Sequence, residues 1–416
     1  MSQWKYMSRR NVLAAGGMAA AGLGLAACGG GDSGGGGGGG SALNQWYHQY
    51  GEAGTEDAAK KYAADYPDGD VNVNWVMGDY AAKLSTSLLS GEGVDIFENN
   101  AIAVDQAEQG RYADLTSIME QVADQFSEAA LIQPLIDGKY WGVPMILDPQ
   151  FFYYRKSLLD AAGIAPPETW DDLVAAAKEL TSPEISGLFL GNNLDATTWP
   201  MIWAAGGTPL TEDFSATAFN TEGLASGMAG IQQMQADKSL LTGAPADWAD
   251  PSAFATGLCA MAWGGCWALP QLEEVHGDDV GVFPLPAIGG EGRQVSLVNP
   301  WTEQIAGASK NVEGAMEFVK WLWIENTEAQ TDWSLNYGFH IPPLKAAAEA
   351  AEPLKAGNGL EIVKMSNEMG VSGPPQWTGD IGTPYADAVS NILKNGADPA
   401  EALAGAEEAG NKVLSR

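Results

Sequence analysis

The stretch from Asp137 to Lys156, DGKYWGVPMILDPQFFYYRK, constrains the fold more than any other part of the sequence. Its Asp-Gly pair lies between apolar residues and predicts a tight turn that leads into an extended segment. Pro144 lacks a backbone N–H, which predicts that this segment does not lie in the middle of a sheet. The aromatic run 151–154 is strongly strand-prone, and a helix is expected from about Ser157.

One carboxylate, Asp148, lies in the apolar run between these extended segments, directly before a second proline. Burying an acid there without a partner would be unfavourable. We therefore interpret the stretch as a strand that leaves one domain and enters a second, with Asp148 at the crossing and facing a cleft.

The first residues have the pattern of an export signal, predicted over residues 1–27. Arg9-Arg10 is typical of the twin-arginine route, which exports folded proteins. The apolar segment 12–27 is too short to span a membrane. It ends in a lipobox-like sequence before Cys28, which predicts cleavage there and a lipid, such as palmitate, on the thiol. A plain secretory peptide is the alternative.

Residues 28–40 are predicted to be a lipidated, glycine-rich tether with a reach of roughly 20 Å. Almost all of them are glycine, so they bury too little apolar area to order themselves. The folded body is expected to start near Ser41, and its length favours two domains.

The chain has 21 Lys and Arg against 53 Asp and Glu, a formal net charge of −32. Nucleic acid is therefore excluded as a partner, because phosphate binding needs clustered Lys and Arg. The charge also disfavours adsorption to anionic lipid, so membrane contact is expected through the lipid anchor only.

Neither a metal, a cofactor nor a catalytic role is expected. His48, His276 and His340 lie far apart, and a zinc site would have to gather all three with an acid. No HExxH or Walker A element is present. Cys259 and Cys266 could form a disulfide, but folding in a reducing compartment before export favours two buried free thiols.

Strands alternate with helices in the first part of the body, which predicts parallel β-α-β units. Strands are expected at 43–48, 71–77 and 94–98, and helices at 55–66, 80–89 and 102–109. Ligand crevices in such sheets lie beyond the carboxyl ends of the strands. The segments 46–48, 78–80 and 98–100 are at these ends.

The later part is expected to continue with strands and helices and to end in a largely helical tail from Pro342. Strands are expected at 185–190, 259–263, 280–284 and 295–298, and helices at 167–180, 221–235 and 312–324. Trp199 and Trp203 lie four apart around a helix that starts at Pro200. Trp170, Trp321 and Trp323 are interpreted as packing residues.

Five of the 15 tryptophans are interpreted as lying next to glycine or at strand ends, outside periodic apolar faces. They are Trp46, Trp263, Trp267, Trp301 and Trp377. Flat aromatic faces suit the C–H face of a sugar ring, while Asp, Glu and Asn suit its hydroxyl groups. Each ring can equally be a core residue, and a ligand role is favoured for Trp267 and Trp301.

The mature chain resembles the family 1 extracellular solute-binding proteins, the sugar-capturing lipoproteins of ABC importers that include maltose and trehalose binding proteins. The most specific part of the resemblance is 137–144 with Asp148 and 152–156. The other matching segments are 25–28, 93–97, 170–173, 260–267 and 318–322.

The resemblance implies an α/β fold of the type II periplasmic-binding-protein class. Two lobes, each a mainly parallel sheet flanked by helices, would be joined by three crossovers, with ligand trapped between them. Lobe 1 would comprise 41–148 plus 296–328, and lobe 2 would comprise 149–295 plus 329–416.

The resemblance also implies that Asp148 and Trp267 contact sugar. A family loop falls on 298–301, where Asn299 and Pro300 replace its glycines. The full set of candidate ligand-binding residues is Trp46, His48, Tyr80, Glu98, Asn99, Asp148, Trp203, Trp263, Trp267, Asn299, Trp301 and Trp377.

The expected function is that of a monomeric, extracytoplasmic, non-enzymatic receptor. It would deliver a mono- or oligosaccharide to ABC permease subunits that work with a separate ATPase. One alternative is a receptor for a polyamine or peptide, since acidic clefts suit cations. The other is a secreted glycoside hydrolase, with Asp148 and Glu98 as two carboxylates about 5 to 9.5 Å apart.

Overall fold

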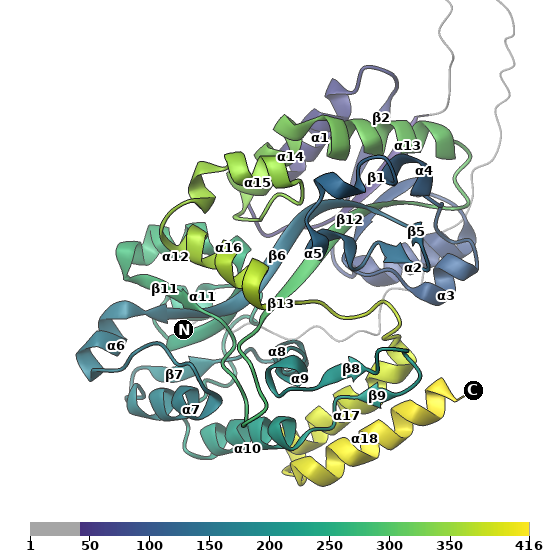
Figure 1. Ribbon diagram of the computed structural model, residues 1–416. Helices are drawn as coiled ribbons and strands as arrows, with labels where there is room; N and C mark the ends of the chain where they lie inside the picture. Colours follow the sequence, from purple (N-terminus) through teal and green to yellow (C-terminus); the bar gives the residue numbers. More distant parts are fainter. Residues whose placement is uncertain (1–41, 416) are drawn as a thin grey trace, which may run out of the picture. The chain divides into compact units, whose positions relative to one another are not determined.

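The computed structural model describes residues 42–415, and a mixed nine-stranded sheet runs through its centre (Figure 1). The strand order is β2-β1-β3-β12-β6-β10-β7, with β11 paired to β6 and β13 paired to β12. The predicted signal peptide, Cys28 and the tether lie outside the described residues.

The predicted parallel β-α-β units at the start of the body are confirmed, because β1 pairs in parallel with both β2 and β3. Asp79 begins the helix after β2 by accepting a hydrogen bond from the Ala82 N–H at 3.0 Å. Gly91 ends that helix with a φ of 70°, a conformation that favours glycine. The elements of this part are β1 (Leu43–His48), α1 (Thr55–Asp65), β2 (Val71–Val76), α2 (Tyr80–Ser90), β3 (Ile96–Asn99), α3 (Val104–Glu108), α4 (Thr116–Met119) and α5 (Glu128–Leu131).

The predicted tight turn at Asp137-Gly138 is confirmed. Both residues have positive φ, and they join β4 (Leu135–Ile136) to β5 (Lys139–Tyr140) as a hairpin. The extended segment that follows is β6 (Val143–Arg155).

The prediction that Pro144 keeps this segment out of the middle of the sheet is wrong. β6 is a central strand, antiparallel to β12 (Ser296–Ile305) on one side and β10 on the other. Pro144 lies opposite Thr302, where the register of β12 shifts between Trp301 and Thr302. An irregularity at that point accommodates a residue without a backbone donor.

β12 is also longer than the strand predicted at 295–298. It continues through Pro300 and Trp301, so these residues belong to a central strand and not to a loop. Asn299 lies directly opposite Asp148 in the register.

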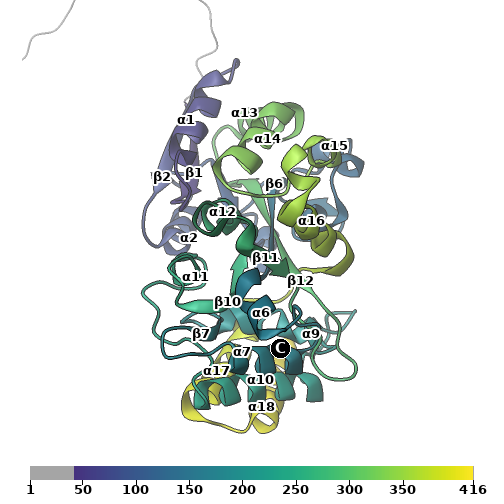
Figure 2. The same ribbon diagram turned by 90° about the vertical axis from the view of Figure 1, so that its left-hand side faces the viewer.

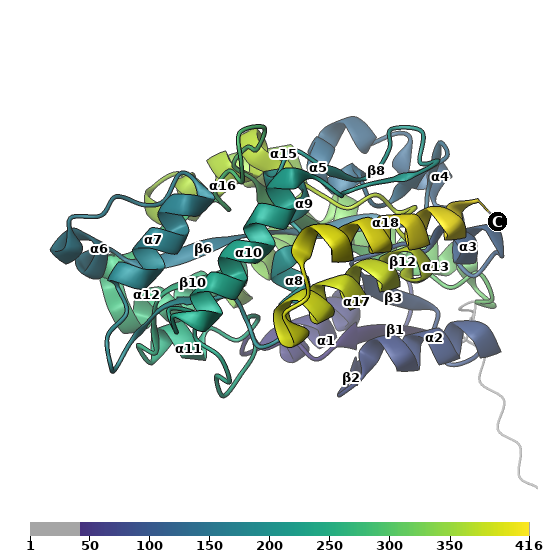
Figure 3. The same cartoon turned by 90° about the horizontal axis from the view of Figure 1, so that it is seen from below.

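The rest of the chain forms the other end of the sheet and most of the covering helices. These elements are α6 (Lys156–Ala162), α7 (Trp170–Glu179), β7 (Ser186–Phe189), α8 (Asp195–Thr198), α9 (Met201–Ala204), β8 (Thr208–Leu210), β9 (Thr217–Ala218), α10 (Glu222–Ala236), α11 (Ser252–Ala255), β10 (Cys259–Gly265), α12 (Leu269–His276), β11 (Val280–Phe283), α13 (Val312–Lys320), α14 (Thr327–Asp332), α15 (Lys345–Ala350), α16 (Gly357–Met369), β13 (Gly370–Val371), α17 (Gly379–Asn395) and α18 (Pro399–Leu414). α16 packs across β6, β11 and β12 (Figure 2), and α17 and α18 pack together beside α10 (Figure 3).

Two large hydrophobic cores lie along this sheet, and β6 contributes to both. Phe151 and Tyr153 belong to the first core and Phe152 to the second, because successive side chains of a strand point to opposite faces. Trp323 belongs to the first core and Trp170 to the second, and Trp321 packs against the first, as predicted.

Cys259 and Cys266 are both buried and free, so the predicted free thiols are confirmed. Among the helices of residues 42–415, none is long and apolar enough to cross a membrane.

Candidate functional site

The parallel pairing of β1 and β3 brings the carboxyl ends of these strands together at His48 and Glu98. The backbone N–H of His48 donates to Glu98 Oε1 at 2.7 Å, and its ring Nδ1 lies 2.5 Å from the same oxygen. The Tyr50 hydroxyl donates to Glu98 Oε2 at 2.5 Å. Glu98 is fully buried, and these contacts supply the partners that a buried carboxylate needs.

The same contacts set the protonation of the neighbouring rings. Burial alone would lower the pKa of His48, but the charge of Glu98 and the hydrogen bond to it raise that pKa above its ordinary value. Burial, followed by the charge of Glu98, raises the pKa of Tyr50 well above its ordinary value. The contact with Glu98 thus favours the charged form of His48 relative to a free imidazole, and Tyr50 remains a neutral donor.

A group of aromatic rings adjoins Glu98. The His48 imidazole stacks on the Trp301 indole from β12, with 4.5 Å between centroids and 18° between planes. The Tyr50 ring lies 4.0 Å from that of His48, and Trp333 packs edge-on against Tyr50 at 5.2 Å. His48, Tyr50 and Trp301 are each partly exposed, while Trp333 is buried beneath them.

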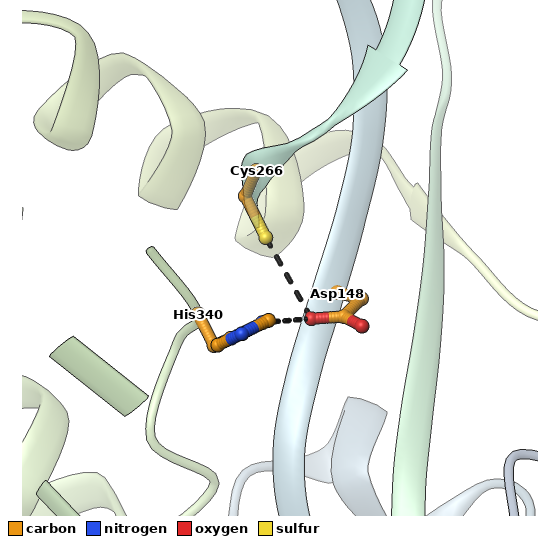
Figure 4. Close-up of side chains that lie close together, drawn as sticks. All are labelled: Asp148, Cys266 and His340. Atoms are coloured by element: carbon orange, nitrogen blue, oxygen red, sulfur yellow. Dashed lines mark hydrogen bonds and ion pairs between the residues drawn. The ribbon is translucent and has the colours of Figure 1, made fainter. Parts of the chain in front are cut away.

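Asp148, which the sequence places at a domain crossing and facing a cleft, is buried against hydrogen-bonding partners. It is only 6% exposed, and its Oδ1 lies 2.5 Å from Nδ1 of His340. The Cys266 thiol donates to the same Oδ1 at 3.7 Å (Figure 4). His340 Nε2 lies 3.5 Å from Oε1 of Glu52. The segment of His340 is held beside β6 by two backbone hydrogen bonds between Leu147 and Ile341.

Opposite charges dominate the electrostatics of this group. Burial alone would lower the pKa of His340, but Asp148 raises it well above its ordinary value. Burial alone would raise the pKa of Glu52, yet its hydrogen bond to His340 holds that pKa below the usual range. Burial, followed by the charge of Asp148, raises the pKa of the Cys266 thiol to about 12. The favoured state is an imidazolium between two carboxylates, next to a neutral thiol.

Tyr80, Asn99 and Asn299 lie near these two groups. The Tyr80 hydroxyl donates to the Glu98 carbonyl at 2.8 Å. The Asn99 carbonyl accepts from the Thr302 hydroxyl at 3.0 Å. Asn299 is partly exposed on β12, opposite Asp148.

Trp46 and Trp267 are partly exposed, each in surroundings of its own. Trp46 contributes to a hollow along α2 with a volume of about 790 Å³. The Trp267 indole N–H donates to the Ala249 carbonyl at 3.0 Å. Its ring lies on the backbone of Gly265, where an added Cβ would come within 1.9 Å of it.

The remaining three predicted residues lie outside the two groups described above. Trp203 and Trp263 are 8% and 2% exposed and belong to the second hydrophobic core. Trp377 is partly exposed in a separate aromatic cluster, 4.9 Å from the Trp199 ring. The structure therefore brings His48, Tyr80, Glu98 and Trp301 together, with Asp148 and Asn299 on the adjoining strands, and it leaves these three tryptophans outside the group.

Sequence reasoning missed five residues of the two groups, namely Tyr50, Glu52, Cys266, Trp333 and His340. Tyr50 and Glu52 follow His48 directly after a strand end, so the strand-end rule could have included them. Nothing local in the sequence connects His340 or Cys266 to Asp148.

The fold and the group of side chains at the ends of β1 and β3 define a type II periplasmic binding protein, a class of solute receptor. Residues 27–323 match the family described as bacterial extracellular solute-binding protein, and the chain belongs to that family.

Curated relatives carry names of several solutes. The probable amino-acid ABC transporter periplasmic-binding protein y4oP of Sinorhizobium fredii is 28% identical over 50% of this chain and 52% of its own length. An arabinooligosaccharide-binding protein of Bacillus subtilis is 30% identical over 30% of this chain and 31% of its own. The chain thus spans about half or less of the length of several curated relatives that it matches. The galactooligosaccharide-binding protein of Bacillus subtilis is 22% identical over 94% of both chains.

Solved structures share the fold along nearly their whole length. A solute-binding protein of Thermotoga lettingae bound with α-D-tagatose has a TM-score of 0.76 and 21% identity, covering 90% of this chain and 99% of its own. The GacH receptor of Streptomyces glaucescens has a TM-score of 0.76 and 22% identity, covering 90% and 98%.

Proposed function

We propose that this chain is the sugar receptor of an ABC importer. It captures a mono- or oligosaccharide between two lobes and delivers it to permease subunits that work with a separate ATPase. The observation that carries the proposal is the partly exposed stack of His48 on Trp301 beside Glu98, the acid at the end of β3. An aromatic face suits the C–H face of a sugar ring, and planar polar groups nearby suit its hydroxyls.

The relatives support a sugar more than another solute. Proteins named for arabinooligosaccharide and galactooligosaccharide binding are among them, and a structural neighbour is bound with α-D-tagatose. A sugar that touches both lobes only when they close would stabilise the closed form. The lobes would be 41–148 plus 296–328 and 149–295 plus 329–416, and the receptor would act as a monomer without enzymatic activity.

The location proposed is the outer side of the cell membrane. The family is extracellular, and the sequence before Cys28 supports twin-arginine export followed by lipid attachment. The glycine-rich tether 29–40 would let the receptor reach its permease.

Isothermal titration calorimetry on the chain from Ser41 onward tests the proposal. The described residues 42–415 belong to one compact unit, so the leader can be omitted. Tagatose, maltose and oligosaccharides of arabinose and galactose are titrated, with spermidine, amino acids and short peptides as the non-sugar arm. Saturable binding of a sugar is expected. Saturable binding of an amine or peptide with no sugar bound would overturn the proposal, and new reducing ends from oligosaccharides would indicate a hydrolase.

A further inference from the structure

We propose that Asp148, Cys266 and His340 form a binding site for one divalent metal ion of borderline softness, with Zn²⁺ as the best match. The metal site shares Asp148 with the candidate sugar-binding residues, but its test does not require a bound sugar. The three residues come from β6, from the turn after β10 and from the segment before α15, and Figure 4 shows their side chains converging on one point.

The distances suit a single ion. One ligand atom from each residue lies within 4.8 Å of the others. Tetrahedral zinc geometry places a sulfur and an oxygen ligand about 3.5 Å apart and a nitrogen and an oxygen ligand about 3.3 Å apart. The Cys266 Sγ to Asp148 Oδ1 distance is already 3.7 Å. His340 Nδ1 is 2.5 Å from Oδ1, so this pair must open by less than about 1 Å.

The donor set selects the class of metal. Thiolate sulfur, imidazole nitrogen and carboxylate oxygen are the three ligand types of zinc sites in proteins. Ca²⁺ and Mg²⁺ take oxygen ligands, which makes a set with sulfur and nitrogen unsuitable for them. With three protein ligands, the fourth position is left for a water molecule or the second oxygen of Asp148.

Glu52 adds the outer partner that metal-bound histidines commonly have. Its Oε1 lies 3.5 Å from His340 Nε2, on the opposite side of the ring from Nδ1. A carboxylate in this place orients the ring, holds the proton on Nε2 and makes Nδ1 the better ligand.

Charge balance allows the exchange of protons for metal inside a buried site. All three side chains are buried. Without metal the group holds a carboxylate, an imidazolium and a neutral thiol, with no net charge. Binding of M²⁺ releases the thiol proton and the Nδ1 proton to solvent, leaving M²⁺, a carboxylate, a thiolate and a neutral imidazole. The net charge of the three side chains with the ion is again zero, and the Glu52 carboxylate stays beside the His340 ring, so the exchange buries no additional charge.

Metal titration of the purified chain tests the site. After treatment with a chelator and its removal, ZnCl₂ is titrated by calorimetry in buffers of different ionisation enthalpy, and CoCl₂ is titrated by absorption. We expect one ion per chain, release of about two protons at a pH where the thiol and His340 are both protonated, and a thiolate-to-cobalt charge-transfer band.

Matched variants separate this site from other thiols and imidazoles. Cys266→Ser and His340→Gln should each weaken zinc binding by at least about 100-fold, and Cys266→Ser should abolish the charge-transfer band. Cys259→Ser, at a buried free thiol at the start of β10, should leave both unchanged. Circular dichroism of each metal-free variant checks its fold.

A measurement on the unaltered chain tests the site even if the variants fail to fold. Zinc should slow alkylation of Cys266 by iodoacetamide in mild denaturant at least about tenfold more than that of Cys259, as followed by peptide mass spectrometry. Zinc binding weaker than about 10 µM would overturn the proposal. So would unchanged binding in folded Cys266→Ser, or equal protection of the two cysteines. The three residues would then form a hydrogen-bonded cluster only.

Discussion

The imidazole of His48 stacks on the indole of Trp301, although the two residues lie on different strands more than 250 positions apart. β12 supplies Trp301 and β1 supplies His48, and β3 lies between them in the sheet. If this stack is the platform for a sugar ring, removing the indole should weaken binding without affecting the core. We expect Trp301→Ala to raise the Kd for sugar at least about tenfold, as measured by calorimetry.

A second tryptophan provides the control for this change. Trp321 is also partly buried, but it packs on Tyr66 and Phe318 away from the strand ends. Trp321→Ala should lower the free energy of unfolding and leave the Kd for sugar within about twofold. Equal losses of affinity in the two variants would contradict the assignment of Trp301 to the site.

The role of Trp267 can be tested in two ways, by removing its ring and by displacing the ring from its place. Trp267→Ala should weaken sugar binding at least about tenfold if its ring contacts the ligand. Gly265→Ala should have a similar effect, because the added Cβ would lie within 1.9 Å of the indole and displace it. Gly290→Ala is the matched control, since no atom lies within 4 Å of a Cβ at that position. Sugar titrations of Gly265→Ala and Gly290→Ala that give the same Kd would show that the indole position does not matter.

Asp148 and His340 should depend on each other for stability. Asp148→Ala leaves a buried histidine without its main carboxylate partner, and breaking such a pair costs about 3–5 kcal/mol. Urea denaturation should show this loss in the single variant. The double variant Asp148→Ala/His340→Ala should lose less than the sum of the two single changes. Additive losses would mean that the two side chains do not interact. Sugar affinities of Asp148 variants therefore need comparison at equal fractions of folded protein.

Much of the fold could be predicted, because it rests on local patterns. Strand–helix alternation fixed the first β-α-β units, and the Asp137-Gly138 turn was recognisable from two residues. The length of β12 could not be predicted. A proline such as Pro300 usually indicates the end of a strand, and only the pairing of β12 with β6 shows that the strand continues.

Only the site residues at or next to the end of a strand could be predicted from the sequence. His48, Tyr80 and Glu98 were found by that rule. His340 was not, since its contact with Asp148 spans 192 positions and depends on the whole chain being folded. The sequence offered Trp263 and Trp301 alike as candidates next to glycine or at strand ends, and which of them is covered depends on the packing of distant elements. Trp263 contacts Phe152 in the second core, with 5.1 Å between ring centroids.

The buried acid Glu303 should make stability depend on pH. Its oxygens accept from Gln45 Nε2 at 3.1 Å and Trp323 Nε1 at 2.7 Å, and burial raises the pKa of the carboxyl to about 8. The folded state therefore holds a proton that the unfolded state has lost between about pH 4.5 and pH 8. Stability is fully present below the unfolded pKa and falls as the pH rises through this window.

Substitution of Glu303 by glutamine tests this pH dependence. Glu303→Gln removes the titration and keeps an acceptor for the Trp323 N–H. Urea midpoints measured at pH 5, 6.5 and 8 should fall more steeply in the unaltered protein than in Glu303→Gln. His340 also binds its proton more tightly in the folded state, so a shallower decline above about pH 6.5 should persist in the variant. Identical slopes in the two proteins would show that Glu303 is already ionised in the fold at pH 5.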